Sequence, residues 1–193
     1  MDRRDAIRHV TALLGGTALV GGSALWNACR PNPPAGQRVG TFTADDVALL
    51  DEIADTILPP TSTPGAKAAG VGPFMALMVT DCYDERDQRI FGDGMRQLDA
   101  ACLAQHHAHF LAASPADRLS LLRALDREQH ASTDAAAPDA PRHYFRMMKE
   151  LALLGYFTSE IGCTRAQRYI ESPGRYDPCV PYAPGTPSWA GHG

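Results

Sequence analysis

Apolar residues recur at helical spacing along most of this chain. Between positions 43 and 58 they form one stripe, which consists of Val47, Leu50, Ala54, Ile57 and Leu58. Thr43 and Asp46 have the spacing of a capping box at the start of this helix, and Pro59 ends it. The pattern therefore predicts an amphipathic helix that begins directly after Thr43.

The same spacing predicts four further helices. They start at Pro73, at about residue 85, after Ser114 and at about residue 144, and the third and last of the five reach about residues 111 and 169. An alanine- and proline-rich loop is expected from 132 to 141. Because no stretch alternates with period two, we predict an all-α domain of about five helices over residues 42–171.

The last predicted helix and the segment after it differ from the rest. Between Leu151 and Phe157 the helix is apolar almost all round, which indicates burial on several sides, within its own domain or against a partner. Residues 172–193 carry prolines that exclude a helix, interleaved with Tyr176, Tyr182 and Trp189. We expect this extended tail to pack on the domain or on another protein, with a partly disordered end as the alternative.

The first 29 residues have the composition of an export signal. Arg3 and Arg4 precede a short, glycine-interrupted apolar run from 10 to 25, and this order is typical of signal peptides. Adjacent arginines indicate the twin-arginine route. A permanent membrane anchor would need ~20 mainly apolar residues, and this run is shorter and rich in glycine. We therefore predict a periplasmic protein in which residues 30–41 form a linker.

The end of this signal can be interpreted in three ways. Residues 25–29 resemble a lipoprotein cleavage box, which would make Cys29 a lipidated residue and associate the protein with the inner membrane. Residues 22–24 are small, as ordinary signal peptidase requires. The third interpretation is that the segment is retained.

Composition excludes some classes of partner and site. The chain has 193 residues and a net charge of −4 without a basic stripe, which argues against nucleic-acid binding. Its five cysteines include no CxxC pair, which argues against a zinc or iron–sulfur site. Cys163 and Cys179 are spaced compatibly with a disulfide that staples the tail; a bond to another subunit and free thiols are the alternatives.

Candidate chemistry is sparse. His106, His107 and His109 lie near Asp99 and Cys102 on a predicted helix, so they are either an incomplete metal site or a solvated helix face. Acidic residues of the first helix, including Asp51 and Asp55, are expected to face solvent. No nucleophile elbow, P-loop or dinucleotide fingerprint occurs. We therefore predict no catalytic residue, no metal and no cofactor in this chain.

Four segments resemble the gluconate 2-dehydrogenase subunit 3 family. They are residues 54–59 (ADTILP), 63–71 (TPGAKAAGV), 150–162 (ELALLGYFTSEIG) and 173–181 (PGRYDPCVP). The resemblance covers most of the chain, about residues 42 to 182, although 84–139 match only in helical character. A twin-arginine signal at the front is also similar to the family pattern.

The resemblance implies a non-catalytic small subunit of a periplasmic complex that oxidises sugars or sugar acids. The large subunit of such complexes is a flavoprotein of the glucose–methanol–choline type, which holds FAD and the active site, and a cytochrome c subunit often accompanies it. The small subunit carries the signal to the export translocon and supports maturation of its partner. An exported lipoprotein or binding module without an oxidoreductase partner is the alternative, followed by a stand-alone metal-binding enzyme.

The apolar helix and the aromatic tail are the predicted contacts with such a partner. Gly155 could let another backbone approach closely, and aromatic side chains are the usual anchors of interfaces. The predicted interface residues are Leu151, Leu154, Gly155, Tyr156, Phe157, Tyr176 and Tyr182.

Overall fold

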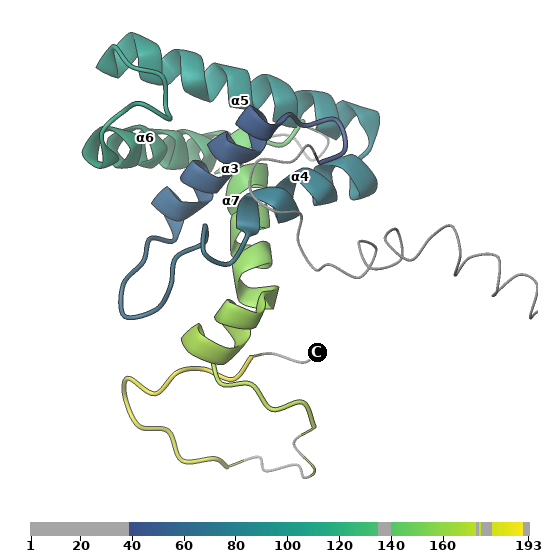
Figure 1. The fold of residues 1–193 in the computed structure, drawn as a ribbon, viewed down its shortest axis with the longest axis vertical. Coiled ribbons are helices and arrows are strands. Elements are labelled where there is room, and N and C mark those ends of the chain that lie inside the picture. The colour runs from purple at the N-terminus through teal and green to yellow at the C-terminus, as the bar shows by residue number, and fades with distance from the viewer. Residues whose placement is uncertain (1–38, 135–139, 173, 175–178, 191–193) are drawn as a thin grey trace, which may run out of the picture. The chain divides into compact units, whose positions relative to one another are not determined.

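A computed structural model describes residues 39–134, 140–172, 174 and 179–190. The chain separates into two units, residues 1–33 and 34–193, and every described residue belongs to the second. The described residues form helices and no strand, so the predicted all-α fold is confirmed. In chain order the helices are α3 (Ala44–Ile57), α4 (Val71–Cys82), α5 (Glu85–His106), α6 (Pro115–Asp134), α7 (Tyr144–Thr158) and the short π-helix η1 (Gly162–Ala166) (Figure 1).

Short polar side chains cap the starts of α3, α5 and α6. The predicted capping box is confirmed at α3, where the Asp46 N–H donates to Thr43 Oγ1 at 3.2 Å and the Thr43 N–H donates to Asp46 Oδ2 at 2.8 Å. Asp84 accepts from the Asp87 N–H at the start of α5, and Ser114 accepts from the Asp117 N–H at the start of α6. Each contact satisfies a donor that the first turn of a helix leaves without an intrahelical partner.

Two helix boundaries differ from the prediction in the middle of the chain. α4 begins at Val71 because Gly70 takes a left-handed conformation (φ 69°) and turns the chain before Pro73 is reached. α5 ends at His106, before the predicted residue 111, because His107 is also left-handed (φ 56°) and closes the helix. Asp99 then accepts from the Phe110 N–H at 2.8 Å, which holds the chain in the turn.

The last helix is shorter than predicted. α7 ends at Thr158 and not near residue 169, because Ser159 adopts an extended conformation. Its hydroxyl donates to the Tyr156 carbonyl at 2.6 Å and accepts from the Gly162 N–H at 3.0 Å. These local bonds compete with the helical pattern and start a separate turn that leads into η1.

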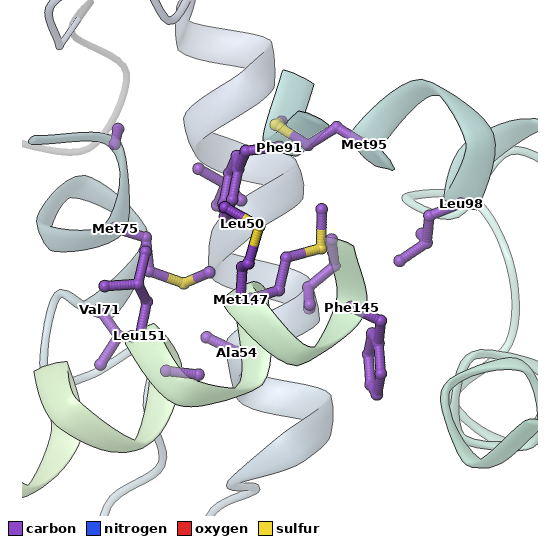
Figure 2. Close-up of a cluster of buried hydrophobic side chains, with 14 of the residues drawn as sticks. Leu50, Ala54, Val71, Met75, Phe91, Met95, Leu98, Phe145, Met147 and Leu151 are labelled. Carbon is purple, nitrogen blue, oxygen red and sulfur yellow. The ribbon is translucent and has the colours of Figure 1, made fainter. Parts of the chain in front are cut away.

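The core lies around α7, which contacts α3, α4, α5, α6 and η1. Met147, Leu151 and Ala152 on α7 are buried against Leu50 of α3 and Met75 of α4, among others. Figure 2 shows Met147 and Leu50 pointing into the same cluster, whereas Phe145 leaves α7 on another side. This packing accounts for much of the apolar character of the last helix within the chain's own domain.

The tail returns to the end of the helical domain. The Arg168 N–H donates to the Ser188 carbonyl and the Ala190 N–H donates to the Arg168 carbonyl, both at 2.8 Å. The Arg168 guanidinium lies 4.2 Å from the centre of the Trp189 ring. The tail thus closes into a loop beyond the end of α7 (Figure 1). Among the residues described, no helix is both long enough and apolar enough to cross a membrane.

Candidate partner interface

A row of side chains along α7 passes from the core to the surface. Phe145, Lys149, Leu153 and Phe157 follow at intervals of four residues, so neighbours in the row lie on adjacent turns of one winding side of the helix. Phe145 is 2 % exposed, whereas Leu153 and Phe157 are 36 % and 40 % exposed. Leu154, beside Leu153, is 46 % exposed. The C-terminal half of α7 therefore presents apolar surface that the described part of the domain leaves exposed.

The structure divides the predicted interface residues on α7 into two groups. Leu151, Gly155 and Tyr156 are buried within the domain. Gly155 lies against the Phe74 ring, because a Cβ at this position would be 2.6 Å from Phe74 Cδ1. Tyr156 donates from its hydroxyl to the Pro64 carbonyl at 2.8 Å. The close approach expected at Gly155 thus comes from this chain's own α4, and these three residues stabilise the domain itself.

The other predicted interface residues differ in position. Leu154 and Phe157 are exposed on α7, and Tyr182, in the tail loop, is 73 % exposed. Tyr176 lies outside the described residues. Contact with a partner through these side chains stays a prediction.

A small cavity opens beside the buried start of the α7 row. It has a volume of about 190 Å³ and lies between the end of α3, α6 and α7. Its lining is mixed, with four apolar and four polar or charged residues: it consists of Thr56, Ile57, Leu119, Leu122, Arg123, Asp126, Phe145 and Lys149. Leu119 is 38 % exposed, so the cavity is open to solvent on the α6 side.

Of the two cationic side chains that line this cavity, one forms a salt bridge with a described residue and the other does not. Lys149 Nζ lies 2.6 Å from Asp126 Oδ1, and this hydrogen bond is the main cause of a lowered pKa for the Asp126 carboxyl. The side chain of Arg123 is exposed and forms no salt bridge within the part of the chain that the structure describes. The cavity therefore carries one positive charge that no carboxylate of these residues neutralises.

Acidic residues of α3, expected to face solvent, instead tie the domain together. Asp51 is buried and accepts from the Gly72 N–H at 3.0 Å, while Asp55 accepts from the Lys67 N–H at 3.0 Å. Burial raises the pKa of the Asp51 carboxyl, although the Gly72 hydrogen bond opposes this. The expectation of a solvated face was wrong for Asp51, because α4 and the loop before it pack against this side of α3.

Glu52 connects three parts of the domain. Its carboxylate binds Lys67 in the loop before α4 and Arg118 in α6. Burial opposes ionisation of Glu52, but the hydrogen bonds and charges of Lys67 and Arg118 outweigh it and lower the pKa. Arg118 also donates to the carbonyls of Phe110 and Leu111 at 2.8 and 2.6 Å. These acidic side chains connect α3 with the loop before α4, with α4 and with α6.

The histidine cluster is dispersed around the turn between α5 and α6. His109 Nδ1 lies 2.7 Å from Asp99 Oδ2, and His106 Nδ1 lies 3.2 Å from Asp117 Oδ1. Across the described ranges, no group of three His, Cys, Asp or Glu side chains is arranged to hold a metal ion. The His109 and His106 imidazoles thus each contact a carboxylate at this turn.

The predicted disulfide is not formed in this structure. Cys163 is a free thiol, and its Sγ donates to the Phe157 carbonyl at 3.3 Å. A bond between Cys163 and Cys179 in an oxidising compartment stays a prediction. The export residues Arg3 and Arg4 and the lipidation candidate Cys29 lie outside the described residues.

Sequence reasoning missed the cavity and its charge. Leu119 and Arg123 are four residues apart on α6, as are Phe145 and Lys149 on α7, so each pair lies on one helix face. Each of these two helices therefore carries an apolar side chain one turn before a cationic one, and this repeated pattern was visible in the sequence. Only the packing of α6 on α7 and α3 shows that both pairs line one cavity.

Comparison with known proteins identifies the family. A family model described as gluconate 2-dehydrogenase subunit 3 matches residues 44–174, which is more than half of the chain and includes all the helices described above. Comparisons with curated proteins and with solved structures give no match. The family description places its members as accessory subunits of a dehydrogenase complex. This chain therefore belongs to the gluconate 2-dehydrogenase subunit 3 family.

Proposed function

We propose that this chain is the non-catalytic small subunit of a periplasmic, flavin-dependent sugar or sugar-acid dehydrogenase of the glucose–methanol–choline type. In this role it supplies a twin-arginine export signal and supports the maturation and stability of the flavoprotein subunit, which holds FAD. In complexes of this type a cytochrome c subunit often accompanies the flavoprotein. The family match over residues 44–174 carries the proposal.

The export signal gives the proposal a physical rationale. Arg3 and Arg4 mark a route for proteins that cross the inner membrane already folded. A flavoprotein that receives FAD in the cytoplasm has to cross in the folded state. One signal on a tightly bound subunit can then serve both chains, provided that the interface survives the passage.

The surface of the domain fits such an association. Obligate interfaces typically bury more than ~2,000 Å² and are more apolar than ordinary surface. Exposed apolar side chains occur both on α7, at Leu154 and Phe157, and in the tail loop, at Val180 and Tyr182. An accessory role agrees with the side chains themselves, because the acids and histidines described above stabilise turns and helix contacts.

The test is to express the tagged chain in its native host and to isolate it from the periplasm. The proposal expects a stoichiometric large subunit with the absorbance of bound flavin and activity on a sugar or a sugar acid. A colourless chain without a partner would contradict the proposal of a complex.

The export role is tested by Arg3→Lys/Arg4→Lys, with Arg8→Lys in the same segment as the matched control. We expect the double variant to leave both chains in the cytoplasm and the control to export both normally. A flavoprotein that reaches the periplasm equally well with the double variant would show that it travels independently.

A further inference from the structure

The cavity between α3, α6 and α7 has the size of a site for one side chain. Small-molecule and cofactor sites usually occupy ~300–1,000 Å³, whereas this cavity has about 190 Å³. Its floor is formed by apolar groups, including Ile57, Leu122 and Phe145. Interfaces commonly concentrate their binding energy where one anchor side chain fills a pocket and excludes its water.

The charge at the cavity indicates what accompanies this anchor. Asp126 is already bound to Lys149 at 2.6 Å, and Gln129 donates to the same carboxylate oxygen at 3.2 Å. Arg123 has no carboxylate partner among the described residues and remains as the unbalanced positive charge. A carboxylate is the complementary group, because a guanidinium can bind its two oxygens together.

The cavity is continuous with the apolar surface of α7. The row from Phe145 through Lys149 and Leu153 to Phe157 covers about 18 Å of helix at ~1.5 Å per residue. Its first two residues line the cavity and its last two are exposed apolar side chains. An incoming segment that fills the cavity can therefore extend along α7 and cover Leu153 and Phe157.

We propose that this surface, which consists of the cavity and the α7 row, is where the dehydrogenase subunit anchors. The occupant is an apolar segment of that subunit that places one side chain in the cavity and a neighbouring aspartate or glutamate on Arg123. The inference rests on the proposed function, because it needs a partner subunit. It differs from the family assignment, which specifies no surface and no complementary chemistry.

Two matched pairs of variants test this surface. Arg123→Glu reverses the charge at the cavity, and Arg127→Glu makes the same change one turn further along α6, at an exposed residue outside the cavity lining. Leu119→Ser removes apolar surface from the cavity rim, and Leu103→Ser does so on α5, where Leu103 is similarly exposed at 43 %. Circular dichroism and thermal unfolding of each isolated variant confirm that it is folded.

The measurement is the amount of flavin-containing large subunit that each tagged full-length chain retains, followed by titration of the separated subunits. We expect Arg123→Glu and Leu119→Ser to weaken the complex at least tenfold and the two controls to stay within twofold of wild type. Equal retention by all four variants would overturn the inference while the proposed function stands. Equal weakening by a variant and its control would also overturn it. A wild-type chain that retains no large subunit would overturn both proposals.

Discussion

The close packing of α5 on α7 at Gly94 gives a prediction whose sign depends on the structure. Gly94 of α5 is buried, and a Cβ at this position would lie 2.5 Å from Tyr144 Cδ2 and still closer to Tyr144 Cβ and Cγ. Gly92, one residue before Asp93 in the same helix, has only Arg96 Nη1 near it, at 4.0 Å. Substitution by alanine should therefore have opposite effects at the two glycines.

The magnitude follows from two opposing terms. Alanine in place of a helical glycine stabilises by roughly 1 kcal/mol, and at Gly92 nothing opposes this gain. At Gly94, ordinary contact requires Tyr144 to withdraw by about 1 Å. Because the Tyr144 Cβ is attached directly to the backbone of α7, a shift of Tyr144 also moves the start of that helix. Overpacking costs about 1–3 kcal/mol and occasionally more. Because this clash involves an atom next to the backbone, we expect the upper end of that range, about 3 kcal/mol, which leaves a net loss of about 2 kcal/mol after the propensity gain of about 1 kcal/mol.

The stability of both variants is measured by chemical and thermal unfolding of the mature domain. At ~2–4 °C per kcal/mol for a domain of this size, Gly92→Ala should raise Tm by about 2–4 °C and Gly94→Ala should lower it by about 4–8 °C. The urea midpoint should move in the same directions with an unchanged slope. If Gly94→Ala were as stable as wild type, the close packing of α5 on Tyr144 would be wrong.

Two further predictions concern the polar ties around α3. Arg118→Lys keeps one positive charge for Glu52 but cannot reproduce the two carbonyl contacts, so we expect this variant to lose about 2–3 kcal/mol of unfolding free energy. The control Arg127→Lys, on the exposed face of the same helix, should change the unfolding free energy by less than about 0.5 kcal/mol. A loss of equal size in both variants would contradict this role of Arg118. Burial raises the pKa of Asp51, so the folded protein holds this proton more tightly than the unfolded chain, and the stabilising contribution is lost as pH rises through the folded pKa. Asp51→Asn keeps the acceptor for the Gly72 N–H and does not ionise. The unfolding free energy of this variant, measured relative to that of wild type, should therefore increase as pH rises from about 3 to 7. A relative unfolding free energy that decreases over this range would contradict the reasoning.

Local sequence was sufficient for the features that depend on neighbouring residues. Thr43 and Asp46 lie within one turn, so their capping box forms wherever the helix packs. The periodic stripe of α3 likewise identified its buried residues Val47, Leu50 and Ala54 in advance. The end of α7 was harder to predict from local sequence. Ser159 stops the helix through hydrogen bonds to Tyr156 and Gly162, which compete with an otherwise favourable helical pattern.

The candidate interface shows the same division. Leu154, Phe157 and Tyr182 were predicted as partner contacts from the apolar helix, the aromatic tail and the family resemblance, and all three are exposed. Leu151, Gly155 and Tyr156 belong to the same apolar stretch, yet they are buried against the chain's own α4 and the loop before it. Helical spacing defines the direction of a side chain but not the element that covers it.

The sequence by itself determined the helical class of this domain, the starts of several helices and the family, and the export signal at the front stays a prediction. Each of these is carried by the order of residues within one segment. Only the tertiary structure decided that acidic residues of α3 are internal ties, that half of the apolar stretch of α7 is core, and that Arg123 lies beside a cavity. The physical reason is that burial and charge compensation depend on groups brought together from α3, α6 and α7, which are far apart in the chain.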